Sequence, residues 1–226
     1  GKCWAGGKVT RSFAKRPTMT YCYSATRYGM QRMILEELRS TDRDLEAVGK
    51  PPYLGGADNY QAALWLSHVI FSAVGKVVKA AEAAMDWLKS AAEVASSDGL
   101  PLWWTTPMGL PVLQEYRTQR GQRVAVHWAG QRVRLTFNDD TPKLDRRAQE
   151  NGVAPNFVHS LDASHLQAVA LRCSEEGLNH LAVIHDSFGT HAADTERLGQ
   201  ILRETFIEQY TDNVLQKFYD ELVAQL

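Results

Sequence analysis

The pattern of hydrophobic and polar positions makes the first hundred residues helical. Residues 10–38 carry apolar side chains at helical intervals and predict a helix. Pro17 should kink or split this helix, because proline lacks an N–H and crowds the carbonyl four residues earlier. A Pro-Pro-Tyr-Leu-Gly-Gly run within 50–56 then breaks the pattern. Residues 60–95, rich in Ala, Leu, Val and Trp, predict one long helix or two helices hinged near Gly75.

The remainder of the chain mixes short strands with helices. Residues 103–116 and 123–137 each predict a β-hairpin, the second turning at Ala129-Gly130. Four further elements are expected: a short helix or turn over 145–152, a helix over 156–173, a short buried strand over 181–184, and helix from 190 to 222. Helices combined with a small antiparallel sheet predict the α+β class.

Composition and charge narrow the class of protein. The chain has 226 residues, of which 44% are hydrophobic and 23% charged, which is typical of a globular protein and not of a disordered one. No run reaches the roughly 18 apolar residues that a transmembrane helix needs, so no membrane partner is expected. Three widely separated cysteines exclude a disulfide scaffold and a four-cysteine zinc site.

The net charge of −1 hides two basic zones. The first covers residues 1–35, which contain no acidic residue, and the second covers residues 117–147. Two separated positive zones favour local anion-binding sites over a general coat for a polyanion. A solvated charged face is the alternative interpretation of either zone.

The first candidate site lies in the first basic zone. Arg11 and Lys15 are four residues apart, so a helix would project both cations from one face. Met19 and Tyr23 continue the stripe at the same interval. Two cations followed by an aromatic ring could clamp a triphosphate and stack on a base or sense a sugar. A solvated basic helix face would show the same pattern.

The second candidate site lies in residues 183–189, where an apolar strand runs into His185-Asp186 and a turn that contains glycine. A carboxylate at the tip of such a turn is open to a hard cation. Mg²⁺ prefers oxygen ligands and commonly binds one or two carboxylates together with substrate phosphates. The alternative is that Asp186 only nucleates the turn.

The third candidate site lies in residues 152–165. Pro155-Asn156 suits the start of a helix, along which His159, Asp162 and His165 recur at every third position. This spacing differs from the i, i+4 histidine pair of the zinc helix motif. Two interpretations remain: a histidine that faces a nucleic-acid groove, or a histidine whose hydrogen bonds are satisfied in the core.

Together and in this order, the three candidate sites resemble the C-terminal part of the phage-type and mitochondrial-type single-subunit DNA-directed RNA polymerases. Residues 104–112 (WTTPMGLPV) and 114–116 (QEY) add to the resemblance, which covers nearly the whole chain. It implies an incomplete right-hand polymerase architecture. Residues 1–100 would form a helical, fingers-like region with the nucleotide-binding helix, and residues 101–226 the remainder of the fingers and palm, with a palm-like sheet and the metal-binding turn.

The resemblance also implies a role for each candidate residue. Arg11 and Lys15 would bind the triphosphate of the incoming ribonucleotide, and Tyr23 would distinguish ribose from deoxyribose at the insertion site. Asp186 would be one of two carboxylates that hold paired Mg²⁺ ions for attack of a 3′-OH on the α-phosphate. The implied catalytic residues are Lys15, Tyr23 and Asp186, and the implied nucleic-acid contacts are His159 and His185.

The implied partners are a DNA template, nascent RNA, ribonucleoside triphosphates and the upstream part of the polymerase. The implied location is the host cytoplasm for a phage-encoded enzyme, or the mitochondrion. The family carries its first metal aspartate upstream of the fingers motif, whereas no acid precedes Glu36 here. We therefore expect the isolated chain to be inactive. The family also typically has glycine where Ser24 and Ala25 stand.

Two alternatives remain open. The chain could be a non-catalytic nucleic-acid-binding remnant, or a fragment of a family A-type DNA polymerase. The related DNA polymerases usually carry Glu after His-Asp at the metal turn, so Ser187 favours the RNA enzyme.

Overall fold

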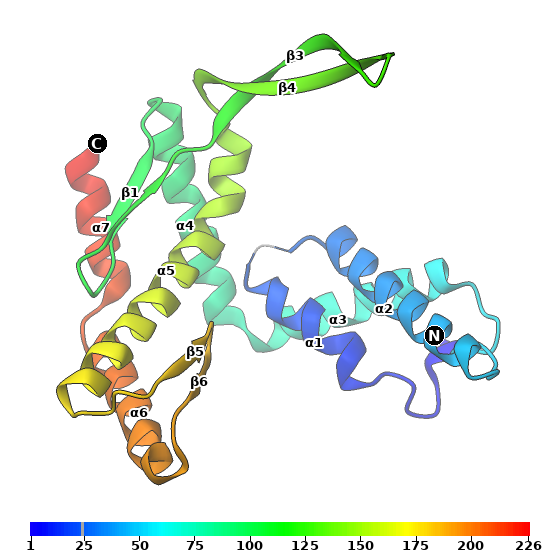
Figure 1. Ribbon diagram of the computed structural model, residues 1–226, viewed down its shortest axis with the longest axis horizontal. Coiled ribbons are helices and arrows are strands. Elements are labelled where there is room, and N and C mark those ends of the chain that lie inside the picture. Colours follow the sequence, from blue (N-terminus) through cyan, green and yellow to red (C-terminus); the bar gives the residue numbers. More distant parts are fainter. Residues whose placement is uncertain (24) are drawn as a thin grey trace. The chain divides into compact units, whose positions relative to one another are not determined.

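The computed structural model describes residues 1–23 and 25–226, so the departure from the family pattern at Ser24 lies outside the described residues. The chain forms two compact units, Gly1–Leu88 and Lys89–Leu226. Within the described residues, helices predominate and the strands pair into three two-stranded antiparallel sheets (Figure 1). The α+β class is confirmed.

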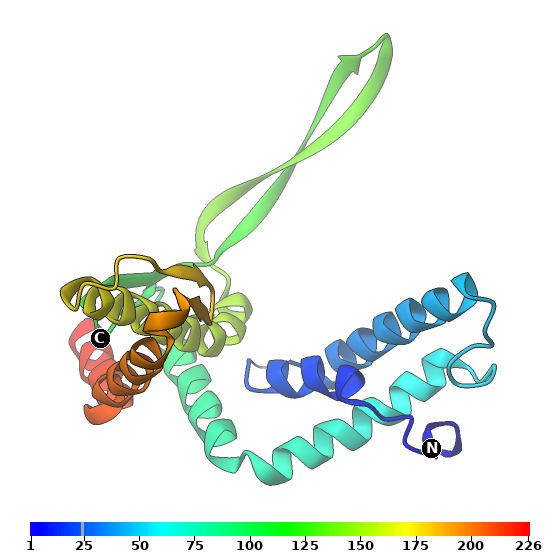
Figure 2. The ribbon, with the colours of Figure 1, turned by 60° about the horizontal axis from the view of Figure 1, so that its bottom comes forward.

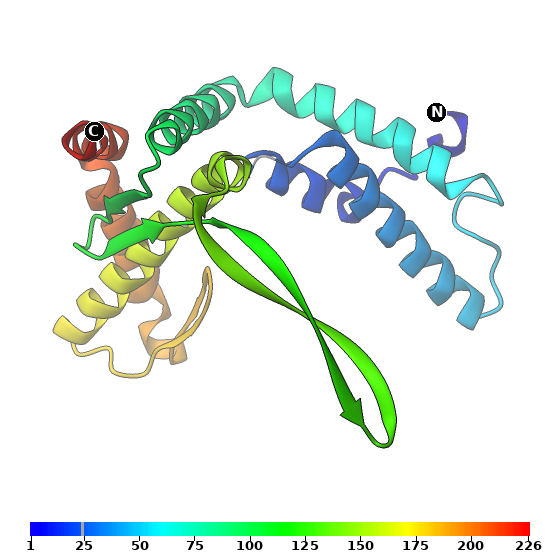
Figure 3. The ribbon, with the colours of Figure 1, turned by 90° about the horizontal axis from the view of Figure 1, so that it is seen from above.

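The first unit is helical. Its elements are η1 (Lys2–Trp4), α1 (Arg11–Tyr21), α2 (Arg27–Ala47), α3 (Asn59–Val77) and the first half of α4 (Lys79–Ser97). The side chains of Thr26 and Asp58 cap α2 and α3 by accepting hydrogen bonds from backbone N–H groups of the first turn. The helices α1, α2 and α3 lie against one another (Figures 2 and 3). Their fully buried side chains include Phe13, Met30, Ile34, Leu38 and Leu66.

The sequence predicts one helix over residues 10–38 that is kinked or split at Pro17. Two helices do occur here, but the predicted position of the break is wrong. Pro17 lies inside α1 and is fully buried. Its packing offsets the loss of the backbone hydrogen bond that proline cannot make. The helix ends after Tyr21 instead. The N–H groups of Tyr23 and Ala25 both donate to the Thr20 carbonyl, at 2.9 and 3.1 Å, and form the turn that stops the helix.

The predicted pair of helices over residues 60–95 is confirmed, but the break lies at Val78 and not at Gly75. The two helices meet there at 94°. Gly75 stays helical and leaves room for a neighbouring side chain, as described below. Within residues 1–23 and 25–226, no single helix is long and apolar enough to cross a membrane; α3 and α4 pass by length and composition only as a bent pair.

The second unit contains the strands. Its further elements are β1 (Leu102–Thr105), β2 (Pro111–Gln114), β3 (Arg117–Trp128), β4 (Gln131–Leu144), α5 (Arg146–Glu175), β5 (Ala182–Ile184), β6 (Ser187–Gly189), η2 (Ala192–Asp194), α6 (Thr195–Thr211) and α7 (Val214–Gln225). The pairs β1–β2, β3–β4 and β5–β6 are each antiparallel. Both predicted hairpins are confirmed, and the second is longer than expected, with its turn at Ala129–Gly130.

The two helices predicted over 145–152 and 156–173 form one helix, α5. Pro155 therefore lies inside a helix and does not start one. Tertiary contacts on both sides of Pro155 offset its missing N–H. On one side, the Gln149 side-chain amide donates to the Gln114 carbonyl of β2 at 3.0 Å, and the Gln114 side-chain amide donates to the Gln149 carbonyl at 2.9 Å. On the other side, Phe157 is buried.

The core of the second unit centres on Trp104 of β1. Its indole N–H donates to the Ser160 hydroxyl of α5 at 2.9 Å. Its ring packs near Phe157 of α5 and Phe218 of α7, with ring centroids 6.0 and 5.8 Å away. Aromatic contacts of this kind join one strand to two helices that are far apart in the sequence.

Two further expectations need correction. The strand predicted as buried over 181–184 is β5, in which Ile184 is 71% exposed. The helix predicted from residue 190 to 222 starts at Thr195 and is interrupted between α6 and α7. The interruption forms because Asn213 adopts an extended backbone and its side chain accepts a hydrogen bond from Gln216 N–H, which begins a new helix.

Candidate nucleotide-binding and metal-binding site

The cationic face of the first candidate site is the exposed side of α1. Arg11 and Lys15 are one helical turn apart and both are exposed. Within the described part of the chain, neither cation forms an ion pair, whereas the neighbouring Arg16 lies 3.4 Å from Glu36. Two exposed cations at this spacing can contact adjacent phosphates of one ligand.

The opposite side of α1 is buried. Phe13, which is 2% exposed, lies between the rings of Trp4 and Tyr53, with centroids 5.2 and 5.4 Å away. The Trp4 indole N–H donates to the Ala62 carbonyl of α3 at 3.0 Å, and the Tyr53 hydroxyl donates to the Lys8 carbonyl at 2.9 Å. The packing of Phe13 holds the first turn of α1, and the two hydrogen bonds hold the segment before it, so these contacts set the direction of the cationic face.

The expectation that Tyr23 continues the helical stripe of Arg11, Lys15 and Met19 is wrong. The helix α1 ends at Tyr21, and Tyr23 lies in the turn after it, half-buried. Its N–H donates to the Thr20 carbonyl at 2.9 Å, so Tyr23 lies directly after the end of the helix.

The metal-turn candidate is the two-residue turn of the β5–β6 hairpin. Ile184 pairs with Ser187 across the hairpin, which leaves His185 and Asp186 at the tip, both exposed. His185 has φ 56°, a left-handed conformation that histidine adopts more readily than most residues. Leu181, just before β5, and Phe188, in the middle of β6, pack against the buried cluster of Val169, Cys173, Leu198 and Ile201.

The donor atoms at this tip fit one ligand position of Mg²⁺. The Asp186 carboxylate is a hard oxygen donor that solvent reaches, and the Ser187 hydroxyl lies 3.5 Å from its Oδ1. Within the described residues, no group of three or more His, Cys, Asp or Glu side chains is placed to hold a metal ion. The tip can therefore contribute to a magnesium site but does not form a complete one.

The structure separates the two histidines of the third candidate site. His165 is half-buried, and its Nε2 lies 3.1 Å from both the Leu202 carbonyl and the Thr205 hydroxyl of α6. It is thus a core histidine with satisfied hydrogen bonds. His159 lies six residues earlier on α5 and is exposed, as is Asp162. Only the exposed histidine suits contact with a ligand.

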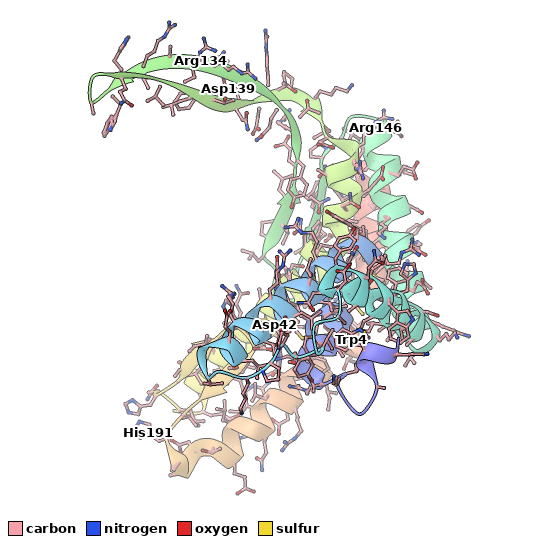
Figure 4. The ribbon with its side chains drawn as sticks, turned by 90° about the vertical axis from the view of Figure 1, so that its right-hand side faces the viewer. Trp4, Asp42, Arg134, Asp139, Arg146 and His191 are labelled. Carbon is pink, nitrogen blue, oxygen red and sulfur yellow. The ribbon has the colours of Figure 1, made fainter. Side chains whose placement is uncertain are left out.

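The second basic zone falls mainly on the β3–β4 hairpin, whose register gives it two different faces. Arg123, Arg134 and Arg132 occupy one face, because their pairs Arg123–Thr136, Ala125–Arg134 and His127–Arg132 are two residues apart. The Val124–Leu135 and Val126–Val133 pairs occupy the other. Figure 4 shows Arg134 and Asp139 on this ribbon. Near its turn, the hairpin is therefore basic on one side and apolar on the other, and the apolar side continues into the Arg120–Asp139 pair.

Sequence reasoning missed Tyr21. It is 5% exposed, and its hydroxyl donates to Glu82 of α4 at 3.0 Å. Burial, together with the hydrogen bond to the Glu82 carboxylate and its negative charge, raises the pKa of Tyr21. The signal was present in the spacing, because Phe13, Pro17 and Tyr21 recur at every fourth position and mark the buried side of α1.

Comparison with known proteins agrees with these motifs. The family described as DNA-dependent RNA polymerase matches residues 2–226, and the chain belongs to this family. The DNA-directed RNA polymerase of Enterobacteria phage T3 is 37% identical over 99% of the chain and 26% of its own length. The corresponding values are 36%, 99% and 26% for T7 RNA polymerase of Escherichia phage T7, and 34%, 93% and 16% for the mitochondrial DNA-directed RNA polymerase of Mus musculus.

The predicted resemblance to the phage-type and mitochondrial-type polymerases is thereby confirmed. The chain spans about a quarter of the phage relatives and less of the mouse relative. Further relatives include a chloroplastic/mitochondrial enzyme of Nicotiana tabacum, so phage and organelle enzymes are both represented.

Proposed function

We propose that the chain supplies the nucleotide-binding helix and one metal-binding carboxylate of a template-dependent RNA polymerase of right-hand architecture. The observation that carries this proposal is the family match over residues 2–226, which includes every candidate residue. The geometry of each unit supports it. The first unit presents Arg11 and Lys15 on an exposed helix face, and the second presents Asp186 at the tip of a hairpin.

The residues of the first unit would bind the incoming ribonucleoside triphosphate. Arg11 can donate two hydrogen bonds to a phosphate, whereas Lys15 acts as a point charge. Cations held in fixed positions stabilise the negative charge that develops on the phosphates in the transition state. Tyr23, in the turn just beyond this helix, would pack at the insertion site and distinguish the ribose 2′-OH.

The residues of the second unit would bind metal and nucleic acid. The Asp186 carboxylate would hold Mg²⁺ together with a carboxylate from the upstream part of the polymerase. When bound, paired Mg²⁺ ions activate the attacking 3′-OH and stabilise the leaving group in phosphoryl transfer. The exposed His159 and His185 would contact the DNA template or the nascent RNA.

Asp186 alone would leave two divalent cations under-neutralised beside the substrate phosphates, so we expect the chain to be inactive by itself. The names of the relatives favour an RNA polymerase over a family A-type DNA polymerase. Because phage and organelle enzymes both occur among these relatives, the host cytoplasm and the mitochondrion are both compatible locations.

The test is Mg²⁺-dependent RNA synthesis on a primed template, with the chain alone and with the chain joined to the upstream part of the polymerase. We expect synthesis only from the joined protein. The Asp186→Asn variant should lose activity by about a thousandfold or more, because it removes a charged metal ligand. The matched control is Asp98→Asn, a change of an exposed aspartate in the loop after α4. An Asp186→Asn variant as active as the Asp98→Asn control would overturn the proposal.

A further inference from the structure

Tyr21 occupies a setting that none of the roles above uses. It is the last residue of α1, and its hydroxyl donates to Oε1 of Glu82, in the first turn of α4, at 3.0 Å. Its ring packs edge-on against Phe71 of α3, with centroids 5.0 Å apart and planes at 66°. A single side chain thus contacts both helices that flank the bend at Val78.

Gly75 shows how closely the phenol passes over α3. A Cβ atom added at Gly75 would lie 2.8 Å from the Tyr21 hydroxyl oxygen, closer than real Cβ contacts allow. Glycine at this position therefore makes room for the hydroxyl, and this explains why a glycine occurs inside a helix that does not break there. The fit between Tyr21 and the bend is specific and does not reflect general apolar burial.

The end of α1 in turn determines where Tyr23 lies. Only one residue separates Tyr21 from Tyr23, and the Thr20 carbonyl accepts hydrogen bonds from both Tyr23 N–H and Ala25 N–H, at 2.9 and 3.1 Å. The hydroxyl of Thr20 donates to the Arg16 carbonyl at 2.9 Å. A movement of the last turn of α1 would consequently carry the backbone of Tyr23 with it.

We propose that Tyr21 is a positioning residue of the nucleotide site: by bonding Glu82, it holds the end of α1, and with it Tyr23, in the orientation that selects ribose. The inference rests on the proposed function, because it requires Tyr23 to meet the sugar. Tyr21 itself touches no substrate. Because burial and the Glu82 carboxylate raise the pKa of Tyr21, the phenol stays protonated and remains a donor at neutral pH.

The test compares kcat/KM for ATP and dATP in the polymerase that contains this chain and its upstream part. The Tyr21→Phe variant keeps the ring and removes the hydrogen bond. We expect it to lower the ATP/dATP ratio by about two- to tenfold, the range that corresponds to one hydrogen bond. Glu82→Gln, which keeps an acceptor oxygen, should retain the ratio. Glu82→Leu should lower it as Tyr21→Phe does, and the double variant should lower it no further.

The matched control is Tyr53→Phe. It removes a hydrogen bond of similar length, from the hydroxyl to the Lys8 carbonyl at 2.9 Å, and leaves a ring packed on Phe13 of the same helix. We expect it to lower Tm about as much as Tyr21→Phe while leaving the ATP/dATP ratio unchanged. Equal ratios in the two variants would show that Tyr21 is merely structural and would overturn the inference.

A third variant separates this inference from the proposed function. If Tyr23→Phe lowers the ratio and Tyr21→Phe does not, the proposed function stands and the positioning role is wrong. If Tyr23→Phe leaves the ratio unchanged, the assignment of sugar selection to Tyr23 fails and the positioning role fails with it.

Discussion

The two segments that carry candidate site residues, α1 in the first unit and the β5–β6 hairpin in the second, are held in very different ways. The helix α1 is anchored along its length by Phe13, Pro17 and Tyr21, all buried, and only its cationic side is exposed. The hairpin has strands of three residues and is anchored by Leu181 and Phe188, while Ile184 beside the tip is 71% exposed. A two-stranded hairpin of this size is marginally stable unless it packs on another surface.

The difference suggests a division of labour. Fixed cations bind an anionic ligand without the cost of ordering their backbone, because the core of the first unit has already set it. The carboxylate at the hairpin tip lies on an element that a further surface can steady, such as the upstream part of the polymerase. The proposed phosphate site is therefore expected to exist before assembly, and the proposed metal site to be completed by assembly.

The largest expected effect on stability comes from Phe13, which anchors α1. Phe13→Ala removes a ring that is 2% exposed and leaves a cavity between Trp4 and Tyr53, so it should lower the free energy of unfolding by about 3–5 kcal/mol. Chemical denaturation measures this change. The control Met19→Ala, on a side chain of α1 that is 53% exposed, should change the free energy of unfolding by less than about 0.5 kcal/mol. Similar losses in both variants would contradict the anchoring of α1.

A smaller effect is expected at the hairpin. Phe188 is half-buried and packs on the Val169 and Cys173 cluster, so Phe188→Ala should lower the free energy of unfolding by about 1–2 kcal/mol. Ile184→Ala, near the exposed tip, should cost less than about 0.5 kcal/mol in the chain alone. If Ile184→Ala lowers the free energy of unfolding more in the assembled polymerase than in the chain alone, another surface covers the tip. An equal loss in both would contradict the idea that assembly stabilises the hairpin.

The anchor of α1 should weaken at alkaline pH. The pKa of Tyr21 is raised in the folded state by burial and by Glu82, so its contribution to stability is fully present below its unfolded pKa, about 10. The contribution is lost as pH rises through the folded pKa. Thermal unfolding between pH 9 and 11 should show a steeper fall for the wild-type chain than for Tyr21→Phe. Parallel curves would contradict the burial of this phenol.

The Glu176–Arg197 pair, which joins the end of α5 to α6, should contribute less to stability at acid pH. This effect should be smaller than that of Tyr21. Hydrogen bonds from Arg197 of α6 lower the pKa of Glu176, the residue that follows α5, so its contribution is present above the unfolded pKa of about 4.3. The contribution is lost as pH falls through the folded pKa. Glu176→Gln should flatten the loss of Tm between pH 5 and 3. Since the pair is exposed, salt should also weaken it, and a salt-independent difference would contradict this account.

Much of the fold follows from local sequence, and the exceptions have identifiable causes. Glycine and proline runs marked the breaks, and alternation marked the hairpins, because these signals act over a few residues. Pro17 and Pro155 misled because both lie in helices whose buried packing offsets a missing N–H, a tertiary effect that local pattern does not report. The break at Val78 was expected at Gly75 for the same reason. Gly75 makes room for the Tyr21 hydroxyl, which is a tertiary contact, and does not break the helix.

The candidate site was predictable to a similar extent. Spacing placed Arg11 and Lys15 on one helix face, and an apolar strand followed by a turn that contains glycine placed Asp186 at the turn. The position of Tyr23 could not be read from spacing, because the end of α1 depends on two backbone hydrogen bonds to Thr20. The roles of His159 and His165 could not be separated either, since the core partners of His165 come from α6, about forty residues later.

The most direct test of the account replaces Mg²⁺ with Fe²⁺ in the full polymerase and maps peroxide-induced backbone cleavage, which occurs close to the bound iron. With a ribonucleoside triphosphate present, we expect cuts beside Asp186 and cuts in α1 near Lys15, and we expect both sets to disappear in Asp186→Asn. Cleavage beside Asp186 with none in α1, at saturating nucleotide, would show that the cations and the carboxylate do not serve one substrate.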